Sequence, residues 1–401
     1  SWLYCFEFVS AKDEKIKSVL LNMAMIQARH LGRSCAQAPK DARSFKAIQG
    51  LIFSAVCLPG AEIMLDVSFD LLDREIDWQV LPDGGHIERN PSLALEILSR
   101  FNHIKALLLA AHIEVPIQLQ SAIDKIPPMV RALRLGDGGL AQFNGGYEEE
   151  RNLIDTVLAD TGARGKALAS APHSGFQRLA AGRTLIIVDT GKPALSGMRN
   201  SHAGTLSFEM SVGKDRLVVN CGTASSEDRE WFSAMQATAA HSTLSVNSLN
   251  SSLLDKHGIV LGPMIVECRR SEADGAVWLD TSHDGFLNRV GVIHRRKLYL
   301  DTSGEDFRGE DVIEGSSGKD YTIRFHLHPN VQASQSRGRR NVLLKLFRGA
   351  GWEFQASGGT ICLQESVYLN GHDGPRRSNQ IVVSGSLQSD GAKIKWRFHK
   401  F

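Results

Sequence analysis

The spacing of the apolar residues changes about 175 residues into the 401-residue chain. Before that point apolar side chains recur every three or four positions, which is the spacing of one buried face of a helix. After it they occur in short runs separated by Gly, Asn and Asp, which is typical of antiparallel strands. This change predicts an all-helical half followed by an all-β half, joined through the Gly-, Ala- and Ser-rich segment 162–174.

The helical half is predicted to form paired antiparallel helices connected by short loops. Proline and glycine interrupt the pattern between the helices, as expected where a helix must end. The predicted helices cover residues 16–26, 44–57, 61–80, 92–111, 117–135 and 148–160.

The second half is predicted to be an antiparallel β-sandwich, because it contains many short strands at regular spacing. The predicted strands cover residues 184–189, 206–211, 216–220, 243–246, 259–268, 277–279, 289–300, 321–328, 341–347, 352–356, 360–368, 380–383 and 393–398. We therefore expect a helical domain over 1–163 and a sandwich domain over 164–401.

Composition and charge exclude several classes of protein. The longest apolar run, 51–58, is closed by Pro59 and is too short to cross a membrane. The net charge of +2 gives no reason to expect nucleic acid as a partner. Residues 1–163 hold 16 Lys and Arg against 21 Asp and Glu, whereas the remainder holds 30 against 23. A basic sandwich of this kind could present cations to a polyanion. The six cysteines are scattered, which favours reduced thiols.

Four side chains able to bind a substrate or move a proton fall within five positions of one loop between two predicted helices. They are His86, Glu88, Arg89 and Asn90. Gly84 and Gly85 allow a tight turn before them, and Pro91 suits the first turn of the next helix. A helix start capped by Asn90 would explain the same pattern, so the spacing alone leaves both interpretations open.

Further candidates lie in a glycine loop and at strand ends. Tyr147 follows Gly145 and Gly146, a position from which its phenol could face the His86 loop. His202, Asn220 and His241 each lie at the end of a predicted strand and could converge on one cation. Asparagine is a poor zinc ligand compared with histidine, cysteine or carboxylate.

Five motifs occur in an order that resembles the heparinase II/III-like family. They are Asp-Gly-Gly-His-x-Glu-Arg-Asn-Pro at 83–91, Phe-Asn-Gly at 143–145, Ser-His-Ala-Gly-x-Leu-Ser-Phe-Glu at 201–209, Val-Asn-Cys-Gly at 219–222 and Ala-His-Ser-Thr at 240–243. The resemblance implies an incomplete α/α toroid followed by an antiparallel β-sandwich, with a substrate cleft between them. It also implies a polysaccharide lyase acting on uronate-containing glycans, and a chain that begins part-way through the toroid.

The resemblance also implies roles for the candidate residues in β-elimination. The uronate carboxylate must be neutralised, which Asn90, Arg89 or a protonated Glu88 could do. The C5 proton must be removed and the C4 oxygen protonated, and Tyr147 and His86 are the candidates for these two steps. His202 and His241 resemble the family's sandwich histidines, which flank the cleft or hold a structural metal.

The chain departs from the family pattern at several of these positions. The family's Ser-Pro-x-Tyr-His is replaced by Asn-Pro-Ser-Leu-Ala at 90–94, and a second histidine before the Ser-His-Ala motif is replaced by Arg199-Asn200. The Asp that usually follows His-Ala is Gly204, and the family's metal-binding Asp corresponds to Asn220. No cofactor is expected to be required; the metal prediction is a structural zinc held by His202, Asn220 and His241.

The sequence therefore predicts a lyase whose partner is an acidic polysaccharide or oligosaccharide, with no nucleic acid and no membrane span. Two alternatives stay open: a non-catalytic glycan-binding or cell-envelope protein, and a hydrolase that pairs Glu88 with an acid from 148–150. The resemblance favours the bacterial envelope or periplasm, while the absence of a visible signal peptide leaves the cytoplasm open. The oligomeric state is also open, a homo-oligomer included.

Overall fold

A computed structural model describes residues 14–37, 39–194, 198, 200–225, 227–255, 258–338 and 340–401. Features noted before Glu14 and at Arg199 lie outside these residues. The chain divides into two compact units that alternate along the sequence. The helical unit comprises residues up to Ile87, then Leu93–Pro128 and Asp155–Gly165. The sandwich unit comprises Glu88–Ser92, Met129–Ile154 and Lys166–Phe401.

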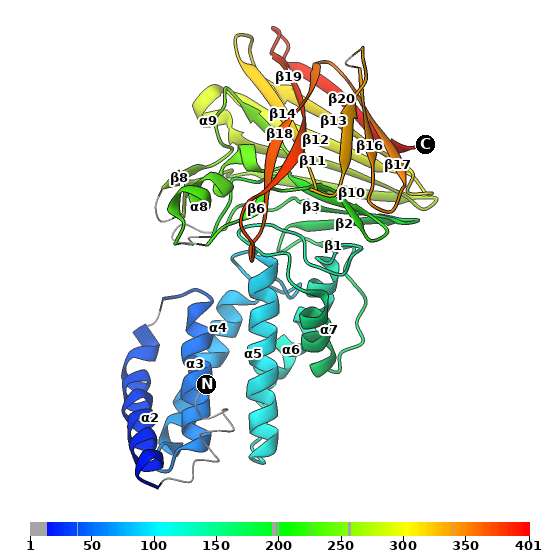
Figure 1. Ribbon diagram of the computed structural model, residues 1–401. Helices are drawn as coiled ribbons and strands as arrows, with labels where there is room; N and C mark the ends of the chain where they lie inside the picture. Colours follow the sequence, from blue (N-terminus) through cyan, green and yellow to red (C-terminus); the bar gives the residue numbers. More distant parts are fainter. Residues whose placement is uncertain are drawn as a thin grey trace. The chain divides into compact units, whose positions relative to one another are not determined.

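The predicted helical region is confirmed (Figure 1). Its helices are α2 (Glu14–Ser34), α3 (Arg43–Cys57), α4 (Leu65–Gln79), α5 (Pro91–Ala110), α6 (Ile117–Ala132) and α7 (Arg151–Asp160), with 3₁₀ turns η1 (Cys35–Gln37) and η2 (Glu62–Met64). On α3, Phe45, Ile48 and Ile52 are buried together because they share one helical face. The Phe45 ring packs edge-on against Phe101 of α5, with ring centres 5.1 Å apart. The ring of a toroid stays a prediction.

The sandwich is confirmed, and its described strands form two main sheets. The first has ten strands in the order β1-β2-β3-β4-β5-β14-β19-β18-β6, with β7 also paired to β14. They are β1 (Ser170–Ala171), β2 (Phe176–Ala181), β3 (Thr184–Asp189), β4 (Phe208–Val212), β5 (Asp215–Val219), β6 (Gly222–Thr223), β7 (Leu244–Val246), β14 (Asp320–Leu327), β18 (Thr360–Asn370) and β19 (Arg376–Ser386). Every pairing is antiparallel except that of β18 with β6.

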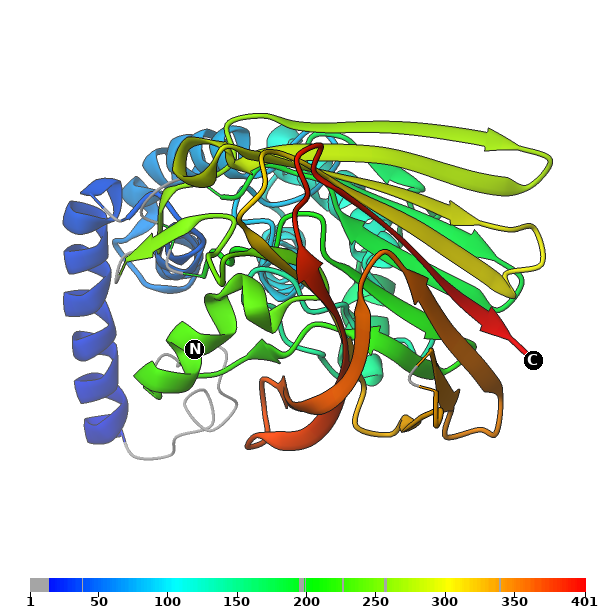
Figure 2. The same ribbon diagram turned by 90° about the horizontal axis from the view of Figure 1, so that it is seen from above.

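The second sheet has eight strands, all antiparallel, in the order β10-β11-β12-β13-β20-β17-β16-β15. They are β10 (Val266–Ala273), β11 (Ala276–Phe286), β12 (Val292–Leu300), β13 (Asp306–Glu314), β15 (Gln332–Gln335), β16 (Asn341–Lys345), β17 (Gly351–Ser357) and β20 (Ala392–Lys400). Figure 2 shows its long strands side by side, from the yellow-green β10–β11 hairpin to the red β20.

The two sheets enclose one aromatic core. Phe208 from the first sheet stacks on Trp396 from the second, with ring centres 5.7 Å apart, and Phe325 packs edge-on against the same indole at 4.9 Å. Both sheets therefore bury one face of alternating side chains against the other, which is the arrangement that defines a sandwich.

One departure from the predicted strands has a local cause. The single strand predicted over 259–268 is two strands, β9 (Gly258–Leu261) and β10, because Gly262 and Pro263 interrupt it. Strand β9 pairs with β8 (Leu253–Asp255) as a small separate hairpin. The short helices α8 (Arg229–Gln236) and α9 (Leu287–Val290) and the turn η3 (Thr238–Ala240) complete the described elements.

Among the helices that the structure describes, none combines the length and the apolar character needed to cross a membrane.

Candidate functional site

Arg89 ties the loop before α5 to the first sheet. Its backbone has a φ of 56°, and its buried guanidinium pairs with Asp189 at the end of β3. The same group donates to the carbonyls of Ser174 at 2.7 Å and Lys192 at 2.9 Å. Because its donors are satisfied by this buried pair and by backbone oxygens, the arrangement gives Arg89 a structural task rather than a position in which it faces a substrate.

Asn90 joins two of the motifs that the sequence singled out. Its Oδ1 accepts from the backbone N–H of Ser92 at 2.9 Å, so it caps α5, which is one of the two interpretations that the spacing left open. Its Nδ2 donates to the carbonyl of Asn144 at 2.9 Å, and the Asn144 side chain donates back to the carbonyl of Arg89 at 3.1 Å. The α5 start and the glycine loop are thus held together by a reciprocal pair of amides.

The glycine loop places Tyr147 beside Asn90. Gly145 has a φ of +76°, and a Cβ on Gly146 would lie 3.2 Å from Asn90 Oδ1, so the loop packs closely on the residue that precedes α5. The backbone N–H of Tyr147 donates to Ser92 Oγ at 2.7 Å. Its half-buried ring lies against His372, with ring centres 5.4 Å apart. Within the described residues, no hydrogen bond involves its hydroxyl.

His202 and His241 form a second pair, fixed by the turn that precedes His241. His241 Nδ1 lies 2.8 Å from the carbonyl of Ala237, and His241 Nε2 lies 3.1 Å from His202 Nδ1. A Cβ at position 204 would lie 2.6 Å from His241 Cδ2, so the His241 ring occupies the space beside Gly204, where the family has Asp. The backbone N–H of His202 also points to Asn144 Oδ1 at 3.5 Å.

The partners of this pair define the proton on each ring. A carbonyl only accepts, so His241 Nδ1 carries a hydrogen. Burial lowers the pKa of His241 to about 4, so the ring is neutral and its Nε2 is a bare acceptor. His202 Nδ1 must then be the donor. Burial, with a smaller contribution from His241, lowers the pKa of His202 well below its usual value, so His202 Nε2 is left with a lone pair.

That nitrogen, His202 Nε2, is buried and has no hydrogen-bond partner among the described residues. Buried polar atoms without partners are rare in folded proteins, and each one calls for a physical reason. An imidazole nitrogen held as an acceptor by a defined chain of hydrogen bonds is the form that a general base needs.

The other two loop candidates have different surroundings. His86 belongs to the helical unit, where its Nε2 donates to Gln79 Oε1 at 2.8 Å. Burial lowers the pKa of His86 to about 3, so its ring is neutral at physiological pH. Glu88 is buried in the sandwich unit with Arg89 and Asn90. The structure therefore brings Asn90, Tyr147, His202 and His241 onto connected segments of one unit.

Asn220 is held by the backbone around it. Its Nδ2 donates to the carbonyl of Gln142 at 3.1 Å, and its Oδ1 accepts from the N–H of Ser242 at 3.0 Å. Both nitrogens of His241 are also engaged, so these three side chains do not present three available donor atoms to one cation. Within the described residues, no three His, Cys, Asp or Glu side chains form a metal-binding group. The arrangement as it stands does not fit the zinc site that the resemblance implied.

Elemental analysis of the purified protein tests this disagreement directly. We expect much less than one zinc per chain, because binding would have to break the His202–His241 hydrogen bond. A stoichiometry near one, lost in a His241→Ala variant, would instead show that coordination replaces that bond.

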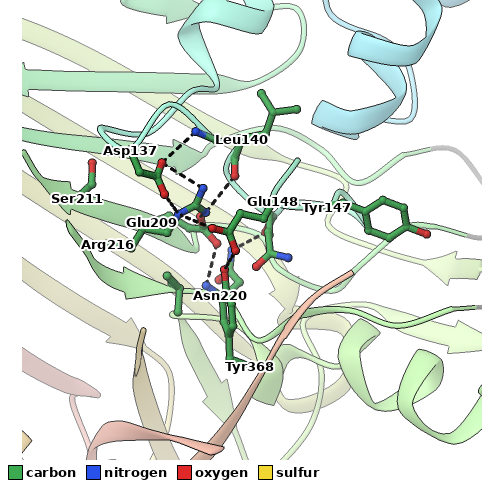
Figure 3. Close-up of polar contacts among 12 residues, drawn as sticks. Asp137, Leu140, Tyr147, Glu148, Glu209, Ser211, Arg216, Asn220 and Tyr368 are labelled. Atoms are coloured by element: carbon green, nitrogen blue, oxygen red, sulfur yellow. Dashed lines mark hydrogen bonds and ion pairs between the residues drawn. The ribbon is translucent and has the colours of Figure 1, made fainter. Parts of the chain in front are cut away.

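Arg216 of β5 is the centre of a charged cluster that was not among the predicted site residues (Figure 3). The buried guanidinium binds both carboxylate oxygens of Asp137, at 2.6 and 3.3 Å, and donates to the carbonyl of Leu140 at 3.0 Å. Glu148 and Glu209 lie 3.6 and 3.8 Å from it. Although burial opposes the effect, Arg216 holds the pKa of Asp137 below its usual value.

The cluster fixes the loop on which Tyr147 lies. Glu148 follows Tyr147 directly, and its Oε2 accepts from the Tyr368 hydroxyl of β18 at 2.8 Å. In Figure 3 the Tyr147 side chain points away from these charges. Two strands of the first sheet therefore anchor the loop from one side, and its tyrosine projects on the other. A signal for this was present in the Leu-Ser-Phe-Glu motif, whose last residue is Glu209.

Glu209 should make stability depend on pH. Burial raises its pKa from an ordinary 4.5 to about 7, although Arg216 opposes this. Between these values the folded state binds the proton more tightly than the unfolded state, so Glu209 makes the protein less stable as pH rises from about 4.5 to 7. The penalty reaches about 3 kcal/mol above that range. We expect the thermal midpoint of the wild type, relative to Glu209→Gln, to fall over this interval; parallel curves would contradict it.

Solved structures of other proteins share this fold. A helical region followed by this sandwich matches solved polysaccharide lyases. A heparan sulfate lyase from Pedobacter heparinus is 15% identical, with a TM-score of 0.75 over 95% of this chain and 63% of that chain. Heparinase III is 16% identical, with a TM-score of 0.77 over 96% and 62%. A chondroitin AC lyase from Streptomyces coelicolor is 10% identical, with a TM-score of 0.56 over 92% and 62%.

The family follows from the sequence comparisons. The family model described as "Heparinase II/III-like, C-terminal" matches residues 163–397 of this chain. The chain therefore belongs to the heparinase II/III-like family. FtsZ-localized protein C from Caulobacter vibrioides is 30% identical over 411 residues, which cover 97% of this chain and 70% of that protein. The chain spans less than two thirds of the lyase structures that it matches.

Proposed function

We propose that this protein is a polysaccharide lyase that cleaves a uronate-containing acidic glycan by β-elimination. The observation that carries the proposal is the buried lone pair of His202 Nε2, fixed by the His241 relay and without a partner among the described residues. A neutral imidazole in this state can take a proton without first losing one. We infer the class of reaction, β-elimination, from the family and the fold.

In the proposed reaction His202 Nε2 takes the C5 proton of the uronate. The electron pair of the broken C5–H bond forms the C4=C5 double bond while the bond from C4 to the glycosidic oxygen breaks. The Tyr147 hydroxyl gives its proton to that oxygen, and Asn90 contacts the carboxylate whose neutralisation makes the C5 proton acidic. The last role requires the Asn90 amide to exchange its bond to the Asn144 carbonyl for one to the substrate.

In this proposal His202 has the proton-transfer role for which the sequence suggested His86. His86 Nε2 is committed to Gln79, whereas His202 is linked through Asn144 to the Asn90 and Tyr147 segments. Glu148, named in the hydrolase alternative, accepts from Tyr368 and lies against Arg216, so its carboxylate is engaged. These contacts favour elimination over hydrolysis by Glu88 and Glu148.

Ultraviolet absorbance tests the proposal, because elimination creates a double bond conjugated with the uronate carboxylate. We expect absorbance to rise when the full chain is incubated with at least one polysaccharide from a panel of alginate, hyaluronan, heparan sulfate and polygalacturonate. His202→Gln should lower the rate at least a hundredfold with an unchanged thermal midpoint. Saturated products would support a hydrolase instead.

A non-catalytic glycan-binding role is the second candidate, and one observation favours it. The identity to FtsZ-localized protein C, at 30%, is about twice the identity to the lyase structures, and the name of that relative describes where it localises rather than a reaction. Binding of a panel glycan without any rise in absorbance would select this candidate and reject the lyase.

A further inference from the structure

The outward face of the second sheet carries a groove of about 910 Å³, within the range of ligand sites in proteins. Side chains on a strand alternate between the two faces of a sheet. On β11 and β12, Leu279 and Leu298 point into the core, while Trp278 and Tyr299 point outward. The groove extends over strands β10, β11, β12, β13, β20 and β17.

An aromatic pair forms part of the groove. Trp278 and Tyr299 are directly opposite each other on β11 and β12, with ring centres 5.1 Å apart, and the Trp278 side chain is 38% exposed. Arg308, opposite Tyr299 on β13, holds its guanidinium 5.5 Å from the centre of the Tyr299 ring. Arg397 lies opposite Arg308 on β20. Trp278 and Arg397 are three strand spacings apart, about 14 Å, which suits several units of a linear chain.

The charge of the groove is positive. Its outward Lys and Arg residues are Arg269, Lys297, Arg308, Lys395 and Arg397, whereas its acidic residues are Asp280 and Glu310. Asp306, next to the groove, pairs with both Arg308 and Arg397. Glu310 is already shared between Lys297 at 3.4 Å and Lys395 at 3.9 Å. Arg269 is exposed, and no ion pair among the described residues involves it. The surplus of cations favours an anionic ligand.

The position of the groove argues against an extended peptide. Peptides that bind to sheets usually add a strand at an edge, where unpaired backbone groups supply hydrogen bonds. Strands β11, β12, β13 and β20 are each paired on both sides, so this face offers side chains only. Aromatic rings that pack against the C–H faces of sugars, flanked by cations that meet carboxylates, are the side-chain set that an acidic glycan requires.

We propose that the outward face of the second sheet is a glycan-binding surface that takes a uronate-containing polysaccharide, with sugar rings on Trp278 and Tyr299 and carboxylates at Arg269, Arg308 and Arg397. The surface lies on the second sheet, whereas the Tyr147 loop is held by β5 and β18 of the first sheet, and the sandwich core lies between the two sheets. Glycan binding there does not depend on elimination, so either proposal can fail alone.

Affinity electrophoresis of the full chain tests this surface, with alginate, hyaluronan or heparin cast in the gel. The Tyr147→Phe background prevents cleavage during the run. We expect retardation in at least one of these gels and none in neutral dextran. Trp278→Ala and Arg269→Glu should each weaken the apparent affinity at least tenfold, and added salt should weaken it further.

Two variants in the helical unit are matched controls. Trp78→Ala removes a half-exposed tryptophan from α4, and Lys46→Glu makes the same charge change as Arg269→Glu on α3. Both should bind as the parent does. Equal retardation of all four variants would overturn the proposal. The absence of binding to all three glycans would also overturn it. Equal retardation by polyglutamate, lost in Trp278→Ala, would overturn it in favour of an acidic protein partner.

Discussion

Replacing Tyr147 with Phe is expected to lower turnover at least a hundredfold while the protein stays folded. General acid–base groups typically contribute a factor of about 10² to 10⁴ to a rate. The Tyr147 backbone N–H bonds to Ser92 Oγ, and the ring packs against His372; neither contact uses the hydroxyl. Phenylalanine keeps both contacts and removes only the group that would protonate the leaving oxygen.

The measurement is the rate of absorbance rise on the polysaccharide that the wild type cleaves, together with the thermal midpoint. Tyr321→Phe is the matched control, because it removes a tyrosine hydroxyl that donates to the Gly358 carbonyl, within the sandwich. We expect Tyr321→Phe to lose some stability and to keep the wild-type rate. A Tyr147→Phe variant with full activity would remove Tyr147 from the mechanism.

A pH profile tests the role of His202 as the base. Because burial keeps His202 neutral well below pH 6.5, its base form is present throughout the neutral range. The rate should therefore hold as pH falls from 7.5 to 6, and should not follow an ordinary histidine titration. A profile with a midpoint near pH 6.5 would show that an exposed histidine is the base.

Periodicity predicted the elements well where the buried face is apolar. The helix predicted over 44–57 is α3, within one residue, because its core-facing positions are Phe, Ile, Leu and Ala. Strand β13 was missed since its buried face includes Gly309 and Asp311. Asp311 can be buried because Arg296, opposite it on β12, and the indole of Trp396, 85 residues later, bond to it. From the sequence alone, a strand with Gly and Asp on its buried face resembles a polar loop.

The candidate site was harder to predict, because its chemistry depends on partners far along the chain. Arg89 was a candidate to bind a carboxylate, but Asp189, a hundred residues later, takes that role inside the protein. His202 and His241 were linked through a metal, whereas they bond directly to each other across 39 residues. The sequence identified the residue types that could take part in chemistry. It could not predict which hydrogen-bond or ion-pair partner each of them has in the folded protein.

Replacing Arg216 with Met is expected to destabilise the sandwich unit by about 3 to 5 kcal/mol, since removal of one member of a buried charge cluster leaves the others unpaired. Asp137 would lose both of its bonds to Arg216, and Glu148 and Glu209 would lose their nearest cation. Methionine keeps much of the side-chain volume, so the loss would come from charge rather than from a cavity. Denaturant unfolding of the full chain measures it.

Arg295→Met is the matched control. Its ion pair with Asp280 spans 3.4 Å, and both side chains are about 40% exposed, so the cost should stay within about 1 kcal/mol. A second variant, Arg216→Met with Glu209→Gln, should recover part of the loss at pH 8, because the amide removes a buried negative charge. Since Glu148 follows Tyr147, Arg216→Met should also lower turnover beyond what its stability explains. Equal midpoints for Arg216→Met and Arg295→Met would show that the cluster does not hold this loop.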